Sequence, residues 1–287
     1  MPETRVDKRT YPNGVPCWVD TEQPDPAAAR EFYGGLFGWT FEEAVPPGAP
    51  GSYLIARLDG QDAAAIAPAT SGTDAVWNTY IAVDDADRTV EQAAKVGASV
   101  VSPPEDVGPG GRGAALVDPT GVPFRLWQPR RRLGAQNVNV PGAWNFSDPH
   151  TADPESAKAF YAAVFGWEAD ELDLGGGQQS TMLRRPGYGD HLAATIDPDI
   201  HRRQEGIAAP PGFADAIGWM AALDDGEQPH WHVTFAVADR DESVATAVKL
   251  GGSDLSGPVD SAWTKTAIVC DPQGATFTLS QFTPPKG

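Results

Sequence analysis

The feature that most constrains this chain of 287 residues is an internal duplication. The segment AREFYGGLFGW at residues 29–39 returns as AKAFYAAVFGW at residues 157–167. A second segment, DPTGVPFRL at residues 118–126, is matched by DPQGATFTL at residues 271–279. Solenoid repeats have periods of ~20–50 residues, and the repeat here is far longer. The chain is therefore predicted to contain two copies of one domain, arranged in tandem.

Composition and charge exclude several classes of partner. The net charge of −18 disfavours nucleic acids and anionic membranes, which are bound by clustered Lys and Arg. The basic run at residues 130–132 falls between the repeats, where we expect a solvated linker. The chain has no apolar stretch of ~20 residues and no apolar signal segment at its start. Two cysteines, one in each repeat, provide no disulfide framework, so we expect a cytoplasmic protein.

Each repeat is predicted to consist of two modules with one helix and several strands. A helix at 26–37 is indicated by Asp25 as its N-cap, Pro26 at its first position and Gly38 at its end. The other predicted elements of the first repeat are strands 15–20, 53–58 and 63–67, then strand 79–83, helix 86–96 and strands 114–117 and 123–127. Those of the second repeat are strand 144–147, helix 154–165 and strands up to 196, then strand 231–237, helix 241–250 and strands up to 282.

The two repeats differ in length at one place, between residues 196 and 230. This insert, 197–229, contains a Pro-Pro-Gly turn and an acidic turn at residues 224–227. Loops of this length often act as lids or binding segments, although a surface excursion is the alternative. The predicted organisation is an N-terminal arm at 1–13, a first domain at 14–128, a linker at 129–141 and a second domain at 142–283 that carries the insert.

Paired βαβββ modules with an A-x-x-F-Y-x-x-x-F-G-W helix and a D-P-x-G-x-x-F-x-L hairpin resemble the vicinal oxygen chelate superfamily. That superfamily includes glyoxalase I, bleomycin-resistance proteins and extradiol dioxygenases, and the chain resembles its tandem-domain members of actinobacterial type. The resemblance covers residues 14–128 and 142–283. It implies an α+β fold of two tandem domains, each with paired βαβββ modules that form a cupped mixed β-sheet. It also implies that the repeats pack as an internal pseudo-dimer, so that one chain can act as a monomer.

The resemblance further implies where a metal would be bound. Family members with a metal use a His on the first strand, a His or Gln on the fifth and a Glu on the eighth. These positions fall on Cys17, Asn78 and Arg125 in the first repeat and on Asn145, His232 and Thr278 in the second. Arg cannot ligate a metal at physiological pH, and one imidazole with two neutral oxygens is a poor site for iron, zinc or nickel. We therefore predict no metal and no other cofactor.

The second repeat contains all five histidines of the chain. Strand alternation puts His230 and His232 on one face, which by the family position is the cavity. Histidine is a general acid or base near neutral pH, so we predict both as catalytic residues. The alternative is that His230 caps the strand at the surface and His232 is an inert polar residue. The substrate-binding residues predicted for this cavity are Asn145, Ser147, Thr234, Thr278 and Ser280.

The cavity of the first repeat is predicted to have a different lining. Arg125 could hold a carboxylate or enolate between Tyr80 and Trp127 as aromatic walls, or could form a structural salt bridge. Alternation from Cys17 and Val19 predicts that the aspartates at positions 20 and 148 point away from the cavities. Cys17 is not expected to be a nucleophile, because its repeat has no histidine to activate it.

The polar cavity with its histidines favours a metal-independent enzyme of lyase or isomerase type that acts on an aromatic or polyketide-like small molecule. The expected chemistry is acid–base: isomerisation, cyclisation, ring opening or a retro-aldol reaction. A non-catalytic protein that sequesters a small molecule, like the bleomycin-resistance proteins, is the alternative, because no orienting carboxylate is evident beside a base. A metal-dependent glyoxalase or dioxygenase is the third hypothesis. The expected partner is a small molecule, with no nucleic acid and no membrane.

Overall fold

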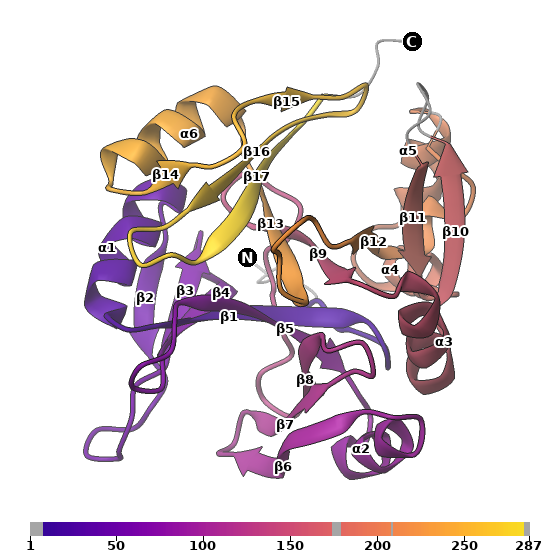
Figure 1. Ribbon diagram of the computed structural model, residues 1–287, viewed down its shortest axis with the longest axis horizontal. Coiled ribbons are helices and arrows are strands. Elements are labelled where there is room, and N and C mark those ends of the chain that lie inside the picture. Colours follow the sequence, from indigo (N-terminus) through magenta and orange to yellow (C-terminus); the bar gives the residue numbers. More distant parts are fainter. Residues whose placement is uncertain (1–7, 174–178, 208, 284–287) are drawn as a thin grey trace, which may run out of the picture. The chain divides into compact units, whose positions relative to one another are not determined.

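The computed structural model describes residues 8–173, 179–207 and 209–283. In the first repeat the elements are β1 (Pro16–Gln23), α1 (Pro26–Phe37), β2 (Thr40–Glu43), β3 (Leu54–Leu58), β4 (Gln61–Pro68), β5 (Val76–Ala82), α2 (Ala86–Lys95), β6 (Ser99–Val107), β7 (Gly111–Val117) and β8 (Pro123–Pro129). In the second they are β9 (Trp144–Thr151), α3 (Pro154–Phe165), β10 (Glu168–Asp173), β11 (Gln179–Arg184), α4 (Tyr188–Thr195), α5 (Ile200–Glu205), η1 (Phe213–Asp215), β12 (Ala216–Ala222), β13 (His230–Ala236), α6 (Arg240–Lys249), β14 (Ser253–Asp254), β15 (Val259–Asp260), β16 (Thr264–Cys270) and β17 (Thr276–Phe282) (Figure 1).

The fold class predicted from the resemblance is confirmed. Within the described residues, the first repeat provides an eight-stranded sheet in the order β2-β3-β4-β1-β5-β8-β7-β6. The second provides a nine-stranded sheet in the order β10-β11-β12-β9-β13-β17-β16-β14, with β15 paired to β16. Both sheets are mixed, since β1 pairs with β4 and β13 with β17 in parallel while hairpins such as β16–β17 are antiparallel.

The ends of the duplicated helices follow from their own residues, as predicted. The Asp25 carboxylate accepts hydrogen bonds from the first backbone N–H groups of α1, and Gly38 ends the helix with a left-handed φ of 72°. Asp153 and Gly166 do the same for α3, where Gly166 has a φ of 69°. These positions are fixed by local chemistry, so both copies keep them.

One predicted strand is wrong. Residues 188–195, which were expected to belong to a strand ending at Ile196, form helix α4. The sheet strand of this module is instead β12, which lies inside the predicted insert 197–229. A segment this short reads equally well as strand or helix, because periodicity over so few residues does not separate the two. The extra residues of the second repeat therefore fold as α4, α5 and η1, between β11 and β12.

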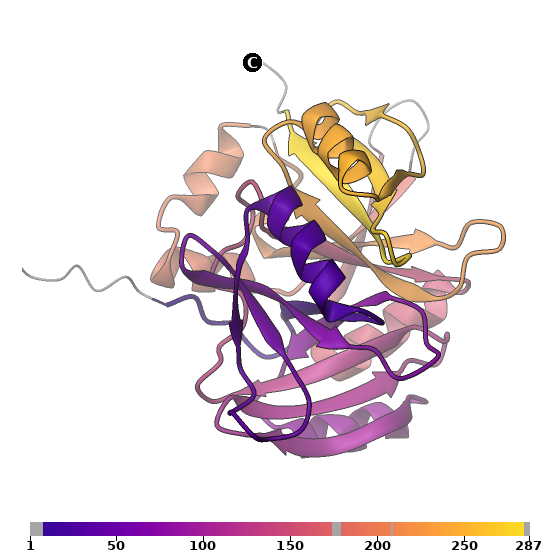
Figure 2. The same cartoon turned by 90° about the vertical axis from the view of Figure 1, so that its left-hand side faces the viewer.

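The chain divides into two compact units, and each unit combines segments from both repeats. The first compact unit contains Met1–Cys17, Ile81–Gln136 and His150–Pro229, and the second contains Trp18–Tyr80, Asn137–Pro149 and His230–Gly287. In the second compact unit, α1 of the first repeat and α6 of the second lie side by side (Figures 1 and 2). In the first, α2 of the first repeat contacts α3 of the second.

The motif aromatics form the core of each compact unit, as predicted. In the second compact unit, Tyr33 stacks on Trp39 with ring centroids 5.8 Å apart, and Phe37 meets Phe235 of the other repeat at 4.8 Å. In the first, Tyr161 stacks on Trp167 at 4.7 Å. Aromatic pairs at these separations add stability beyond the burial of their area. Across the described parts of the chain, helices long and apolar enough to span a membrane are absent.

Candidate functional site

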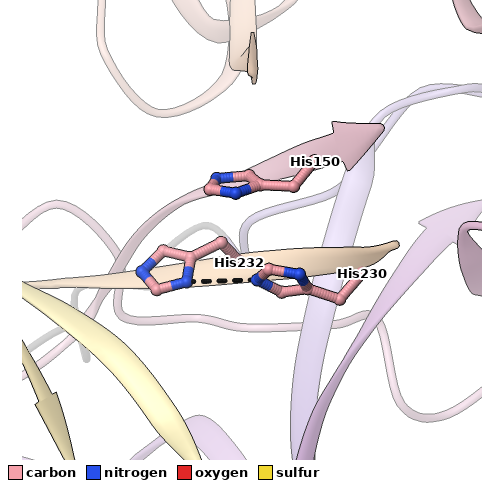
Figure 3. Close-up of side chains that lie close together, drawn as sticks. All are labelled: His150, His230 and His232. Carbon is pink, nitrogen blue, oxygen red and sulfur yellow. Dashed lines mark hydrogen bonds between the residues drawn. The ribbon is translucent and has the colours of Figure 1, made fainter. Parts of the chain in front are cut away.

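Strand β13 positions His230 and His232, the two histidines that were predicted as catalytic residues. Trp231 and Val233 are buried in the core, and strand alternation turns His230 and His232 to the opposite face. His230 Nε2 lies 3.4 Å from His232 Nδ1 (Figure 3). His232 is 8% exposed, and its Nε2 lies 2.8 Å from the Thr278 hydroxyl on β17. Both ring nitrogens of His232 are therefore held, which fixes the orientation of the imidazole.

The hydroxyl residues predicted beside His232 come from the same pair of strands. Because β13 and β17 run parallel, Thr234 is directly opposite Thr278, and Ser280 follows two residues later on the same face. Thr234 and Ser280 are both buried. This part of the second compact unit thus combines imidazoles with hydroxyl groups, which can donate or accept hydrogen bonds to the oxygens of a ligand.

The two predicted residues on β9 have partners of their own. Asn145 donates a hydrogen bond to the Asn139 side chain at 3.0 Å. The Ser147 hydroxyl is fully buried and accepts a hydrogen bond from the Trp144 indole, also at 3.0 Å. Their role in substrate binding stays a prediction.

His150, which was not among the predicted site residues, lies near the end of β9. His150 Nδ1 is 2.9 Å from the carboxylate of Glu227, and both side chains are about a quarter exposed or less. His150 is the residue at which β9 passes from the second compact unit into the first.

Within the second compact unit, His230 and His232 could offer two imidazole ligands to the metal that the resemblance implies. The 3.4 Å between His230 Nε2 and His232 Nδ1 equals the edge of a tetrahedral site with bonds of about 2.1 Å to nitrogen. The family position for a carboxylate ligand holds Thr278, however, and its hydroxyl is bonded to His232. Strand β17 therefore supplies no charged ligand at that position.

In the first repeat, the predicted cavity residue Tyr80 belongs to a hydrogen-bonded cluster around a buried carboxylate. Asp20 is fully buried and accepts hydrogen bonds from Tyr80 at 2.5 Å, Tyr53 at 2.9 Å and Asn78 at 2.9 Å. Burial, and then the nearby Asp20 carboxylate, raise the pKa of Tyr53 well above its usual value. The phenol therefore remains a hydrogen-bond donor at neutral pH.

The prediction that Asp20 points away from the face of Tyr80 is wrong. Asp20 shares that face, because its carboxylate bonds directly to Tyr80 and Asn78. Alternation then puts Cys17 and Val19 on the opposite, fully buried face. The error is a shift of one residue in the strand, which moves every side chain to the other face.

The remaining residues predicted for the first cavity lie on β8. Arg125 pairs with Ala115 of β7 in the antiparallel ladder. The Trp127 indole donates a hydrogen bond to the Arg132 carbonyl at 2.8 Å, so its ring is fixed. Their contact with a substrate remains a prediction.

We expect Cys17 to be unreactive in the folded protein. Its thiol is fully buried, and burial raises its pKa far above the usual value, so the reactive thiolate is absent at neutral pH. Cys270 is partly exposed and serves as the internal control. Maleimide labelling followed by peptide mass spectrometry should modify Cys270 in the folded protein and Cys17 only after denaturation. Labelling of both thiols at similar rates in the folded state would show this placement of Cys17 to be wrong.

A separate pocket of about 280 Å³ lies within the first compact unit, among α4, α5 and η1. Its volume is near the lower end of the ~300–1,000 Å³ typical of small-molecule sites. Its lining combines carboxylates and one histidine with apolar residues such as Phe213, and it includes none of the predicted site residues. Its polar lining includes Asp190, His201, Glu205 and Asp215.

Comparison with known families and proteins gives similarity along nearly the whole chain. Residues 23–126 match the family described as the glyoxalase/bleomycin resistance protein/dioxygenase superfamily, and residues 144–280 match the glyoxalase-like domain. CFP32 of Mycobacterium tuberculosis (strain CDC 1551 / Oshkosh) is 36% identical over 274 residues, which cover 94% of this chain and 95% of the relative. The anthracycline biosynthesis protein DnrV of Streptomyces peucetius is 33% identical over 281 residues, covering 93% and 92% of the two chains. DauV of Streptomyces sp. (strain C5), also named for anthracycline biosynthesis, is 34% identical with the same coverage.

Solved structures with the same fold have much lower sequence identity. The Mn(II)-bound glyoxalase from Novosphingobium aromaticivorans has a TM-score of 0.61 and 14% identity, over 96% of this chain and 84% of that chain. The 2,3-dioxygenase LapB from Pseudomonas sp. KL28 has a TM-score of 0.59 and 12% identity, over 96% and 95%. At this level of identity the likeness shows the fold alone.

Proposed function

Because this chain belongs to the glyoxalase/bleomycin resistance protein/dioxygenase superfamily, we propose that it uses the cupped sheet of its second repeat as a tailoring enzyme for an aromatic, polyketide-like small molecule. The names of DauV and DnrV support the class of substrate, since anthracyclines are fused-ring aromatic polyketides. The class of reaction is acid–base: isomerisation, cyclisation, ring opening or a retro-aldol step. The partner of the protein is a small molecule, and the protein acts as a monomer in the cytoplasm.

The observation that carries this proposal is the fixed imidazole of His232. A neutral imidazole has one nitrogen that donates and one that accepts. A substrate that displaces the longer of the two bonds, the one to His230 at 3.4 Å, would meet a nitrogen that can take a proton from its carbon or hydroxyl. Removal of a proton beside a ketone leaves the electron pair on the substrate as an enolate, and return of a proton elsewhere completes the rearrangement without oxidation. His230 is the neighbouring imidazole, and the hydroxyls of Thr234, Thr278 and Ser280 hydrogen-bond the oxygens of the substrate.

The test is conversion of an anthracycline aglycone, followed by liquid chromatography and mass spectrometry. We expect a product that accumulates with time and requires the folded protein. The intrinsic fluorescence of the aglycone reports binding in the same samples. Saturable binding without any conversion, across a panel of aromatic polyketide ketones, would instead identify a sequestering protein.

A metal-assisted enzyme is the second candidate, and the 3.4 Å between His230 Nε2 and His232 Nδ1 favours it. His230 and His232 would help to hold the ion, which would act as a Lewis acid towards a substrate oxygen. The protein residues would still bind the substrate and transfer its protons.

We expect activity to survive removal of divalent metals, because β17 supplies no carboxylate at the position of the family's charged ligand. Dialysis against EDTA should leave turnover unchanged, and elemental analysis should find no stoichiometric transition metal. About one iron, zinc, manganese or nickel per chain, together with loss of activity on chelation and recovery on adding the metal back, would establish the second candidate instead.

A further inference from the structure

Three large apolar side chains of the second compact unit lie together outside its core. Ile268 on β16 is 38% exposed, whereas the residues on either side of it are buried. Leu255 is 54% exposed, and its backbone N–H donates a hydrogen bond to the Ile268 carbonyl at 2.8 Å. Val259 on β15 is 53% exposed and pairs with Thr266, two residues before Ile268. We call Leu255, Val259 and Ile268 the apolar strip.

The apolar strip adjoins the polar groups of the proposed site. Ile268 is directly opposite Thr278 of β17 in the antiparallel ladder, so the two side chains share one face, with Cβ atoms ~4.5–5.5 Å apart. The Thr278 hydroxyl lies 2.8 Å from His232 Nε2 on β13. All of these residues belong to the second compact unit. One face of this unit thus passes from imidazole through hydroxyl to hydrocarbon within two strand spacings, about 10 Å.

Strand propensity does not account for the apolar strip. Threonine is β-branched like isoleucine and forms strands well, and the same face of β16 uses it at Thr264 and Thr266. Leu255 lies beyond the end of β14 and is not β-branched. Apolar side chains that gather on an exposed surface, rather than scatter over it, mark ligand or interaction sites. Their position beside Thr278 and His232 indicates that the ligand is the substrate.

We propose that Ile268 is a specificity-determining residue, and that the apolar strip binds an edge of the substrate that carries no oxygen. The inference rests on the proposed function and deepens it, because it names the substrate class: a fused-ring aromatic ketone with its oxygens gathered along one edge. Thr278 and Ser280 hydrogen-bond that edge, and the apolar strip removes the opposite edge from water. A carbonyl on the opposite edge would lose its hydrogen bonds to water without gaining a partner from the strip.

The anthrone dithranol and the anthraquinone chrysazin form a matched pair of probes. Both have three fused rings with a carbonyl between two hydroxyls on one edge, and chrysazin carries a second carbonyl on the opposite edge. Titration calorimetry under argon, which keeps dithranol reduced, gives the Kd of each probe. Wild-type protein should bind dithranol roughly five- to tenfold more tightly. This ratio lies below the ~10–200-fold that a closed apolar pocket achieves for one methylene group, because the strip is partly exposed.

Ile268→Thr removes the apolar contact and keeps a β-branched side chain in the strand. It should weaken dithranol binding by about the same factor and bring the preference over chrysazin close to one. Ile268→Leu keeps the hydrocarbon and should bind like wild type. Val248→Thr is the matched control, since Val248 is 50% exposed on α6 of the same compact unit. A wild-type preference in Ile268→Thr, or an equal loss in Val248→Thr, would overturn the role of Ile268.

A thiol placed on the apolar strip locates the ligand without depending on turnover. Cys17 is fully buried, so in a Cys270→Ser background the thiol introduced by Ile268→Cys is the one that reacts. Saturating dithranol should slow its alkylation by iodoacetamide and leave the rate unchanged for Val248→Cys in the same background. Equal rates for Ile268→Cys with and without dithranol would place the ligand elsewhere and overturn the inference.

These outcomes separate the inference from the function on which it rests. Protection of the introduced thiol and preference for dithranol, without conversion of any ketone in the panel, would sustain the inference and contradict the proposed enzyme. Conversion without protection would do the reverse. If neither probe binds, the apolar strip does not select fused-ring ketones and the inference is wrong.

Discussion

Replacement of His232 by alanine is expected to lower turnover at least roughly tenfold while the protein stays folded. A general acid–base group typically raises the rate of an enzymatic reaction ~10²–10⁴-fold. The imidazole is held between Thr278 and His230, so its loss removes the fixed proton acceptor rather than a core contact. His232→Gln separates the two roles of the ring, because an amide can hydrogen-bond Thr278 but cannot take a proton. We expect His232→Gln to be as slow as His232→Ala, with a KM close to the wild-type value.

The control for this prediction is Arg125→Ala in the first repeat. Arg125 is predicted to help bind the substrate rather than to transfer a proton, so its loss should have the smaller effect. Circular dichroism and thermal unfolding establish that each variant is folded. If Arg125→Ala abolishes turnover or binding and His232→Ala is silent, the working site is in the first repeat and the assignment to His232 is wrong.

Replacement of Asp271 by alanine is expected to lower the free energy of unfolding by about 3–4 kcal/mol, because buried donors lose their acceptor. Asp271 is almost fully buried, and its Oδ2 accepts hydrogen bonds from Gln23 at 2.7 Å and Tyr33 at 2.8 Å. Its Oδ1 accepts two backbone N–H groups of its own turn. Burial, and then the adjacent Asp271, raise the pKa of Tyr33 well above its usual value, so the phenol stays a donor at neutral pH.

The duplicated aspartate in the first repeat is the matched control. Asp118 holds its own turn through Oδ1, which accepts bonds from Thr120 and Val122, but its buried Oδ2 has no hydrogen-bond partner among the described residues. Asp118→Ala should therefore lower the free energy of unfolding by only about 1–2 kcal/mol. Urea unfolding of the two variants measures the difference. Equal losses would mean that the bonds from Gln23 and Tyr33 contribute nothing measurable.

The parts of the fold that local chemistry determines could be predicted from the sequence. Asp25, Pro26 and Gly38 define the ends of α1 by themselves, and the D-P-x-G turns define the hairpins. The strand expected at residues 188–195 was wrong because a segment of that length lacks a period that distinguishes strand from helix. The two cupped sheets were predicted from the family resemblance, because no local signal in the sequence specifies how the strands pair.

The sequence patterns could not predict which segments of the two repeats combine within each compact unit. Tyr33 bonds to Asp271, 238 residues further along the chain, and Phe37 packs on Phe235. Helical periodicity shows that Tyr33 and Phe37 are buried but not which residues bury them. Two similar copies of each motif leave that choice open, because either copy offers an aspartate in its D-P-x-G turn and a large apolar residue, Ile81 or Phe235, on the matching strand.

The candidate site was predicted where strand register alone decides it. His230, His232 and Thr278 come together because parallel strands align residues of known alternation. Glu227 was missed as a partner for His150 because a turn, unlike a strand, has no period that tells where a side chain points. The orientation of Asp20 was predicted wrongly because the alternation of side chains along β1 was assigned with a shift of one residue.

Deuterium incorporation tests proton transfer at His232 most directly. Wild-type protein is incubated with an anthracycline aglycone in D₂O that contains EDTA, and the recovered aglycone and product are examined by mass spectrometry. We expect deuterium at a carbon next to a ketone, at a rate well above that without protein, and a rate near that background for His232→Ala. Incorporation by wild type no faster than without protein, or equal incorporation by His232→Ala, would contradict proton transfer at His232.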